Sequence, residues 1–377
     1  MIRAFQDLGC ELIFASQAKE NTFSEELARE KISIKTISAN DSCFDPWIQE
    51  IKPDVVIFDR FMTEEQFGWR VQEQLPDAVR VLDTIDLHFL RRHRESGKND
   101  WKSPDVLREL ASIYRCDQTW LVSDFEQELL KTEFAVPANL LRRISLGYSP
   151  VGENGLEFEQ RENFVFIGNF RHPPNWDAVQ WLARELWPMI QQQLPQVELH
   201  IYGAYPSREA MELDSSVKGL RVFGSVEDQY ETLRKYRVNL APLRFGAGVK
   251  GKILDGWTQG TPCLGSPIAA EGMMNSGGTD HWGGKVVESP SEWVEQALKL
   301  YRDSDEWKIA SITGQQILKN RFSQDEVKQQ IQLLVDDVKS GKQRQSNPGQ
   351  WVGKILWQEQ FLAKKYMSKW IEEKNSP

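Results

Sequence analysis

The stretch APLRFGAGVKGKILDGWTQGTPCLG (241–265) decides the fold class of this chain. Its pattern predicts the end of a strand, a glycine-rich turn, a short helix and a second strand. Gly246 and Gly248 leave room for the backbone to come close to a ligand. Lys250 and Lys252 fall in the first turn of the helix, where a positive charge opposes the helix dipole. Because two lysines at that position cost stability unless an anion is bound, the stretch predicts a phosphate-binding site, and the alternative is a solvated basic turn.

Strands and helices alternate along most of the chain on either side of this stretch. The expected strands lie at 11–15, 32–37, 55–58, 79–82, 119–122, 141–144, 164–168, 197–203, 220–224 and 238–242. Helical patterns separate them, including one at 177–192, and this alternation predicts βαβ units with parallel sheets. The fold class is therefore α/β, with two doubly wound, Rossmann-like domains whose ligands sit at the carboxyl ends of the strands.

Domain boundaries follow from the composition between the two sets of strands. Residues 151–163 are rich in glycine, proline and charge and show little periodicity, which is typical of a linker. We therefore place one domain at 1–150, the linker at 151–163, the second domain at 164–338 and a basic tail at 339–377.

The first domain is expected to lack its opening strand. Residues 1–16 (MIRAFQDLGCELIFAS) read as the end of a helix followed by a strand. Losing a central strand would leave two unpaired sheet edges. We therefore expect the natural chain to start upstream of Met1.

The charge of the chain is unevenly distributed. The 46 Lys and Arg stand against 55 Asp and Glu, and this net charge of −9 argues against a nucleic-acid partner. Residues 339–377 hold eight Lys or Arg and three Glu, a net of +5, so the other 338 residues carry −14.

The basic tail contains an amphipathic pattern at 350–373, with Trp351, Ile355, Tyr366 and Trp370 near one face. Such a helix either packs back onto the first domain or lies at a membrane surface, where lysines attract anionic lipid. Both interpretations stay open at this point.

Other features limit where the protein works. No apolar run approaches the roughly 20 residues of a spanning helix, and residues 1–14 lack a signal-peptide pattern. The four cysteines are far apart and form no CxxC pair, which favours reduced thiols in a cytoplasmic protein. His88 and His93 do not have the spacing of a helical zinc pair, so no metal site and no cofactor are expected.

Four segments carry a resemblance to a known family. They are FVFIGNFRHPPNWDAVQWL (164–182), LHIYGAYP (199–206), VFGSVEDQ (222–229) and APLRFGAGVKGKILDGWTQGTPCLGSPIAAEG (241–272). In this order they resemble the nucleotide-sugar-binding half of GT-B fold glycosyltransferases of the family-4, or group 1, type. The resemblance implies two Rossmann-like domains that face a cleft. It also implies transfer of a sugar, with retention, from a nucleotide diphosphate-sugar donor to a glycan, lipid or protein acceptor, without a bound metal.

The resemblance also implies roles for single residues. The donor diphosphate would be bound by Arg244, Gly246, Gly248, Lys250 and Lys252. Asp255 stands where the family has a glutamate on the ribose, whereas Ala247 stands where the family has the acid that holds the donor sugar. Further donor or acceptor contacts are expected from Arg171, His172, Asn175 and Glu271.

In the first half, VLDTIDLHFLRRHRE (81–95) places Asp86 and His88 just after a strand end, where doubly wound sheets present their chemistry. Related enzymes use a histidine or acid from this half on the transferred sugar or the acceptor, which makes both residues catalytic candidates. The alternative for His88 is a packed loop histidine.

Two other functions fit the same pattern. One is a GT-B sugar-nucleotide epimerase or hydrolase. The other is a catalytically inactive relative that binds nucleotide sugar or a protein partner as a scaffold, which the alanine at 247 favours. For the active transferase, we expect work in polysaccharide or glycoconjugate biosynthesis, in the cytoplasm or at the inner face of the membrane.

Overall fold

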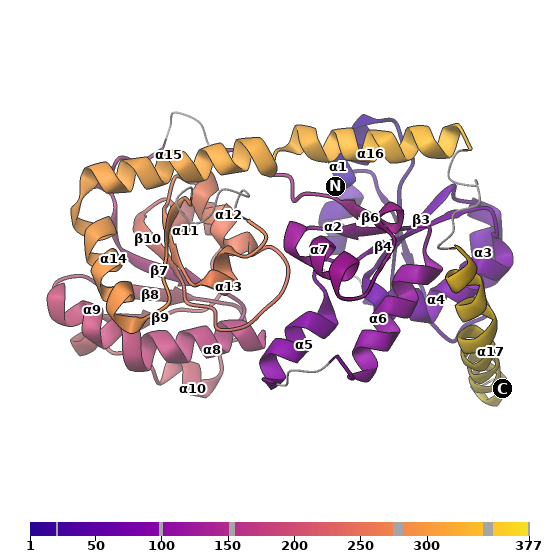
Figure 1. The fold of residues 1–377 in the computed structure, drawn as a ribbon, viewed down its shortest axis with the longest axis horizontal. Helices are drawn as coiled ribbons and strands as arrows, with labels where there is room; N and C mark the ends of the chain where they lie inside the picture. Colours follow the sequence, from indigo (N-terminus) through magenta and orange to yellow (C-terminus); the bar gives the residue numbers. More distant parts are fainter. Residues whose placement is uncertain (20–21, 98–100, 151–154, 274–281, 342–349, 376–377) are drawn as a thin grey trace. The chain divides into compact units, whose positions relative to one another are not determined.

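A computed structural model describes residues 1–19, 22–97, 101–150, 155–273, 282–341 and 350–375. The residues fall into two compact units (Figure 1). Unit 1 contains residues 1–89, 100–144 and 325–377, and unit 2 contains residues 90–99 and 145–324. Residues 325–338, which we placed in the second domain from sequence, therefore group with unit 1, and so does the basic tail.

Unit 2 is built on one parallel sheet of six strands. In chain order these are β7 (Glu162–Ile167), β8 (Leu199–Tyr202), β9 (Leu220–Val222), β10 (Tyr236–Ala241), β11 (Cys263–Gly265) and β12 (Gly284–Val286). Their spatial order is β12-β11-β10-β7-β8-β9, and every neighbouring pair is parallel. The prediction of a doubly wound α/β fold is confirmed for this unit.

Helices cover both faces of this sheet (Figure 1). They are α8 (Pro173–Trp181), α9 (Trp187–Gln193), α10 (Arg208–Met211), α11 (Gln229–Leu233), α12 (Gly251–Thr258), α13 (Pro267–Ala270), α14 (Pro290–Arg302) and α15 (Ser304–Arg321). Phe164 and Phe166 of β7 point to the face where α8, α9 and α14 form the main core. Val165 points the other way and packs on Leu233 of α11. This alternation is the period-two pattern of a strand buried on both faces.

One helix differs from its prediction. A single helix was expected at 177–192, but α8 and α9 are joined by a π-helical turn at Leu182–Leu186. Pro188 in the first turn of α9 has no N–H to donate to the preceding turn, and a local π segment accommodates that loss.

Unit 1 contains two separate parallel sheets. The first pairs β1 (Ile13–Ser16) with β2 (Ser33–Thr36). The second has the order β3-β4-β5-β6, with β3 (Val55–Asp59), β4 (Val79–Asp83), β5 (Gln118–Leu121) and β6 (Leu141–Arg143). Phe14 of β1 is 42% exposed and Ile57 of the edge strand β3 is 36% exposed. Edge strands of both sheets thus carry apolar side chains that are exposed to solvent.

The helices of unit 1 surround these sheets. They are α1 (Ile2–Asp7), α2 (Thr22–Arg29), α3 (Phe44–Ile51), α4 (Arg60–Gln74), α6 (Pro104–Arg115), α7 (Asp124–Thr132), α16 (Gln324–Lys339) and α17 (Gln350–Asn375). Helix α5 (His88–Ser96) starts in unit 1, and its residues from Leu90 onward group with unit 2.

The last helix packs against α4 and α6, which is the first of the two interpretations of the tail. A Cβ at Gly353 would lie 2.2 Å from the Tyr114 carbonyl oxygen, so α17 and α6 approach closely at this glycine. Trp357 donates from Nε1 to the Arg115 carbonyl oxygen at 3.3 Å, and Lys364 pairs with Glu65 at 2.7 Å. None of the described helices is long and apolar enough to span a membrane.

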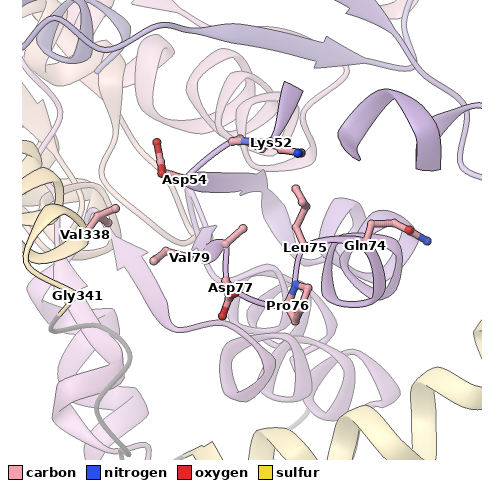
Figure 2. Close-up of a pocket in the computed structure, with 11 residues that line it drawn as sticks. Lys52, Asp54, Gln74, Leu75, Pro76, Asp77, Val79, Val338 and Gly341 are labelled. Carbon is pink, nitrogen blue, oxygen red and sulfur yellow. The ribbon is translucent and has the colours of Figure 1, made fainter. Parts of the chain in front are cut away.

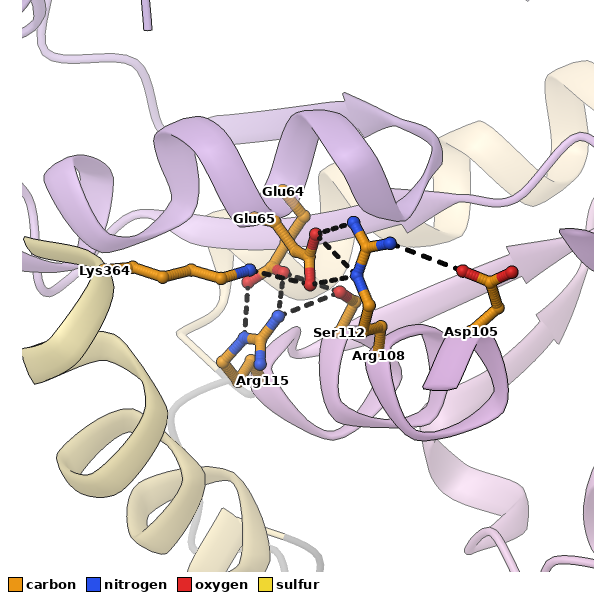
Figure 3. A network of polar contacts seen from close by, with 7 residues as sticks. All are labelled: Glu64, Glu65, Asp105, Arg108, Ser112, Arg115 and Lys364. Carbon is orange, nitrogen blue, oxygen red and sulfur yellow. Dashed lines mark hydrogen bonds and ion pairs between the residues drawn. The ribbon is translucent and has the colours of Figure 1, made fainter. Parts of the chain in front are cut away.

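Buried charges hold α4 and α6 together beneath this helix (Figure 3). Glu64 is fully buried and accepts hydrogen bonds from Arg115 Nε at 2.9 Å and from the Ser112 hydroxyl at 2.7 Å. Arg108 reaches the neighbouring Glu65 at 2.6 Å. The buried Glu64 carboxylate is tolerated because Arg115 supplies the opposite charge.

Candidate functional site

The candidate site in unit 2 lies where the order of strands reverses. Strands β7 and β10 are neighbours in the sheet. After β7 the chain continues to β8 on one side, and after β10 it continues to β11 on the other side. In open α/β sheets, ligands bind at this switch point, outside the carboxyl ends of the strands. The segments that follow these two strands lead into α8 and α12, and they carry most of the predicted donor-binding residues.

The loop after β7 approaches α12 so closely that residue 168 must be small. A Cβ at Gly168 would lie 2.8 Å from the Asn175 side chain and 2.9 Å from Nζ of Lys252. It would displace the two polar groups that meet here.

Lys252 is the central cation of this site. Its Nζ donates to Oδ1 of Asn175 at 2.5 Å and lies 4.3 Å from the centre of the Phe166 ring. Loss of water around the ammonium group lowers the pKa of Lys252 to about 7. Within the part of the chain that the structure describes, no carboxylate lies within ion-pairing distance of this Nζ. Lys252 is therefore a poorly solvated cation whose hydrogen-bond acceptor is a neutral amide.

The glycine-rich turn before α12 adopts the conformations that its glycines allow. Gly246 has φ 149° and Gly248 has φ 66°, both in the region that favours glycine. Lys250 is buried as the residue before the first turn of α12, and its Nζ donates to the Gly248 carbonyl oxygen at 2.6 Å. The predicted placement of both lysines at a helix N-terminus is therefore observed.

Asp255 lies one turn further along α12, with its carboxylate near two tyrosines. The Tyr230 hydroxyl donates to Oδ1 of Asp255 at 3.4 Å, and the Tyr148 hydroxyl also bonds the carboxylate. Burial raises the pKa of Asp255 to about 6. Both tyrosines were missed from sequence, because only the tertiary fold brings residues 148 and 230 to this helix.

Other predicted donor contacts are engaged with protein partners. Arg244 is half exposed and forms a bidentate ion pair with Asp177 of α8, with Nε 2.8 Å from Oδ2. This carboxylate raises the pKa of the guanidinium. A diphosphate contact by Arg244 would therefore use the N–H groups that this pair leaves, or follow opening of the pair.

The residues predicted as further donor or acceptor contacts have different surroundings. Glu271 accepts two bonds of 2.7 Å from Arg94, which also donates to the Gly246 carbonyl oxygen at 2.8 Å. Arg171 stacks its guanidinium 4.1 Å from the centre of the Tyr205 ring. His172 is exposed at the start of α8. Asn175 accepts the hydrogen bond from Lys252.

The candidate site in unit 1 lies at the carboxyl end of β4. Asp83 ends the strand beside Asp59 of β3, and burial raises the pKa of Asp83 to about 6. His88 follows in the first turn of α5, with Nε2 3.5 Å from Oδ1 of Asp86. The side chain of His88 is buried and packs edge-on against Phe61, with 5.6 Å between ring centres. Asp86 and His88 are thus brought together as predicted.

Two buried glutamates at this site escaped prediction. Glu109 of α6 accepts from the backbone N–H groups of His88 and Phe89 at 3.2 and 2.9 Å. Glu126 of α7 accepts from the N–H of Leu87 at 3.0 Å. Burial raises the pKa of Glu109 to about 8. In the sequence, each glutamate falls on the apolar face of its predicted helix. That position alone does not distinguish a buried acid from an exposed one.

A cavity of about 340 Å³ lies elsewhere in unit 1, at the amino ends of β3 and β4 (Figure 2). Lys52, Asp54 and Asp77 contribute polar groups to its wall. Because chemistry in these folds takes place at the opposite edge of the sheet, this cavity is separate from the candidate site. Among the described residues, no three His, Cys, Asp or Glu side chains come together as a metal site.

Comparison with known proteins now bears on this geometry. Residues 161–303 match the family model "Glycosyl transferases group 1". The matched segment lies within unit 2 and contains the glycine-rich turn and Lys252. No curated protein matches the chain in sequence.

Solved structures show the same fold for the chain as a whole. A glycosyltransferase from Rickettsia africae has a TM-score of 0.64 at 13% identity, over 88% of this chain and 91% of that one. Sucrose-phosphate synthase from Thermosynechococcus elongatus has a TM-score of 0.68 at 13% identity, over 90% and 91%. The Anabaena protein HepE, solved with UDP and glucose, has a TM-score of 0.65 at 14% identity, over 89% and 94%. The predicted GT-B fold is confirmed by these likenesses.

Within unit 2, Lys252 generates a prediction about stability. Its pKa of about 7 lies below the 10.5 of an ordinary lysine, so folding favours the neutral amine. The resulting cost to stability is complete below pH 7 and disappears as the pH rises toward 10.5. Lys252→Met removes that cost, and we expect it to stabilise the ligand-free protein at pH 6 by about 1–3 kcal/mol.

Urea denaturation of both proteins from pH 6 to pH 9 measures this difference. The advantage of the variant should shrink as the pH rises, because wild-type Lys252 then loses its charge. Lys285→Met, at an exposed ion pair with Glu306, is the control and should show no such pH-dependent gain. A gain for Lys252→Met that is constant with pH would contradict the prediction.

Proposed function

We propose that the protein is a glycosyltransferase that moves a sugar, with retention, from a nucleotide diphosphate-sugar to a glycan, lipid or protein acceptor. The observation that carries the proposal is Lys252, a poorly solvated cation at the N-terminus of α12 and at the switch point of the sheet. An anionic ligand would supply the charge that its protein surroundings lack.

A donor diphosphate satisfies this requirement. In sugar transfer the bond to the anomeric carbon weakens, and negative charge grows on the departing diphosphate while the sugar resembles an oxocarbenium ion. Lys250, Lys252 and the N–H groups of the first turn of α12 are fixed in place before the reaction, so they stabilise that charge without reorganising. The proposal needs no metal ion, because these groups already supply positive charge.

Other residues receive roles in the same proposal. Gly246 and Gly248 let the backbone approach the diphosphate, and Arg244 contacts it through the N–H groups that the pair with Asp177 leaves, or after that pair opens. Asp255 accepts hydrogen bonds from the ribose hydroxyls in place of the tyrosine hydroxyls. We assign His88 and Asp86 to the transferred sugar or the acceptor, and Arg171, His172, Asn175 and Glu271 to further donor or acceptor contacts.

A panel of donors tests the reaction. Purified protein is incubated with UDP-, GDP- and ADP-sugars, and release of the nucleoside diphosphate is measured with and without candidate acceptors. UDP-glucose comes first, because HepE was solved with UDP and glucose. We expect turnover with one donor class and a loss of at least a hundredfold in Lys250→Ala, because one fixed positive group aimed at the leaving charge is lost.

The matched control is Lys285→Ala, which removes a partly exposed lysine of the same unit and should retain full turnover. Release of free sugar without transfer to any acceptor would point to the hydrolase. Binding of nucleotide without turnover would point to the inactive scaffold. Absence of any nucleotide binding would contradict the proposal itself.

The pKa values of two site residues set the pH dependence of nucleotide binding. Binding requires Lys252 charged, which its pKa of about 7 permits below pH 7, and Asp255 ionised, which its pKa of about 6 permits above pH 6. We expect the affinity for UDP to be greatest between these values and to fall by up to about tenfold for each pH unit above 7.

Isothermal titration calorimetry at several pH values and in two buffers measures this dependence. Near pH 7.5, binding should take up protons as Lys252 becomes charged. Lys252→Met should bind weakly and lose the alkaline fall, whereas Asp255→Asn should keep it. An alkaline fall that persists in Lys252→Met would assign the titration to another group.

We also propose that the protein works in the cytoplasm and contacts the inner face of a membrane through residues 350–373. One face of α17 packs on α4 and α6, and side chains on the opposite face are exposed. Trp351, Ile355 and Trp370 are each at least 60% exposed. At 100° per residue they lie opposite Gly353 and Trp357, which contact α6.

The chemistry of this open face favours lipid over a second protein. Tyr366 joins the two tryptophans, and amphipathic aromatic rings favour membrane interfaces. Lys354 and Lys369 are exposed beside these aromatic residues. Each basic residue near anionic lipid adds about 1 kcal/mol of binding free energy. Protein interfaces, in contrast, are depleted in lysine.

Sedimentation with phosphatidylserine-containing vesicles tests this contact. We expect Ile355→Asp to lower binding by about tenfold, because it removes apolar area and adds a charge that anionic lipid repels. Ile309→Asp is the matched control, since Ile309 is 63% exposed on α15 of unit 2. Equal, weak sedimentation of all three proteins would end the membrane proposal, and self-association that only Ile355→Asp abolishes would assign the face to a second copy.

A further inference from the structure

The connection between β4 and α5 has an unusual backbone. Ile85 has φ 60°, a left-handed conformation that a β-branched residue rarely adopts. The N–H of Asp86 bonds to the Thr84 carbonyl oxygen at 2.7 Å, which tightens the turn. Strain of this kind persists only where the surrounding structure holds the segment in place.

The holding groups are the two buried glutamates. Three consecutive backbone N–H groups, those of Leu87, His88 and Phe89, donate to carboxyl oxygens of Glu109 and Glu126 at 2.9 to 3.2 Å. Glu109 is 1% exposed and Glu126 is fully buried. The two acids come from different helices, α6 and α7, so the start of α5 is attached to both.

Stability alone does not account for this arrangement. The first N–H groups of a helix need acceptors, but one Ser, Thr, Asp or Asn before the helix normally supplies them. Here the residue directly before the helix is Leu87, whose side chain has no hydrogen-bond acceptor, and the Asp86 carboxylate lies 3.5 Å from Nε2 of His88. Two buried carboxylates replace a local cap at the cost of desolvating both acids.

We infer that Glu109 and Glu126 are positioning residues that fix the start of α5, and with it the His88 imidazole beside Asp86, for sugar transfer. The inference rests on the proposed role of His88 and Asp86 in that reaction. Phe89 supports the same placement, because its ring packs edge-on against Trp101 and Phe134 at 5.8 and 5.3 Å between centres. The helix start is thus held through its backbone and through the side chain next to His88.

Conservative substitutions separate positioning from folding. Glu109→Gln and Glu126→Gln keep the size of each side chain but replace one acceptor oxygen by an N–H₂ group that faces a backbone N–H or its surroundings. We expect kcat to fall by about 10- to 100-fold, since misplacement of a reacting group by about 1 Å can cost that much. The KM for the donor and the affinity for UDP should stay within twofold, because the proposed donor contacts lie in unit 2.

The control is Glu64→Gln, a buried acid of the same unit whose hydrogen bonds go to Arg115 and Ser112 of α6 (Figure 3). It should lower the unfolding temperature at least as much as the test variants while leaving kcat within twofold. Equal loss of kcat in Glu64→Gln and Glu109→Gln would reduce the effect to general destabilisation and overturn the inference.

A second readout does not depend on turnover. The chain has five histidines, so the His88 ring signal can be assigned in NMR spectra by comparison with His88→Gln. We expect Glu109→Gln and Glu126→Gln to move this signal and Glu64→Gln to leave it unchanged. An unmoved His88 signal in both test variants would overturn the positioning role. If the His88 signal moves in these variants but the wild-type protein shows no transferase turnover, the positioning role is upheld and the proposed function is refuted. If Glu109→Gln does not fold, Glu126→Gln, which loses a single backbone bond, carries the same two measurements.

Discussion

A poorly solvated cation lies at the centre of the candidate site in unit 2. Lys252 lies at the N-terminus of α12, where the helix dipole and loss of water both oppose a positive charge, and it bonds only to the neutral amide of Asn175 among the described residues. The group lies near the ends of the paired strands β7 and β10. Residue 168 is a glycine, and a side chain there would displace the Lys252 ammonium group. In the proposed function, a bound diphosphate supplies the negative charge beside Lys252. The stability cost and the expected alkaline fall in nucleotide affinity both follow from this charge.

Unit 1 uses buried charge in a different way. Glu64 is neutralised by Arg115 and ties two helices together, which is a structural use of a buried acid. Glu109 and Glu126 instead bind backbone N–H groups at the start of α5, close to the end of a central strand. The same residue type therefore serves packing in one place and the placement of His88 in another. The partners of each acid distinguish the two roles, and burial alone does not.

Sequence reasoning succeeded where local pattern carries the physics. The alternation of apolar runs and helical patterns predicts parallel sheets, and the glycine-rich turn before Lys250 predicts a helix N-terminus because glycine and helix periodicity act over a few residues. It failed where partners come from distant segments. Tyr148 and Tyr230 reach Asp255 from two other elements, and the Arg244–Asp177 pair joins residues separated by 67 positions. The single helix expected at 177–192 contains a π turn, since a proline within a helical pattern changes its hydrogen bonding.

The sequence by itself determined the α/β class, the resemblance to group 1 glycosyltransferases and the placement of two lysines at one helix start. These depend on spacing along the chain, which the order of residues states directly. Only the tertiary structure decided which charges are paired. It showed that Lys252 meets an amide while Arg244 meets a carboxylate, that α17 buries one face and exposes the other, and that two glutamates from separate helices converge on the backbone before His88. Burial and pairing depend on which segments meet in space, and that is set by the packing of the whole unit.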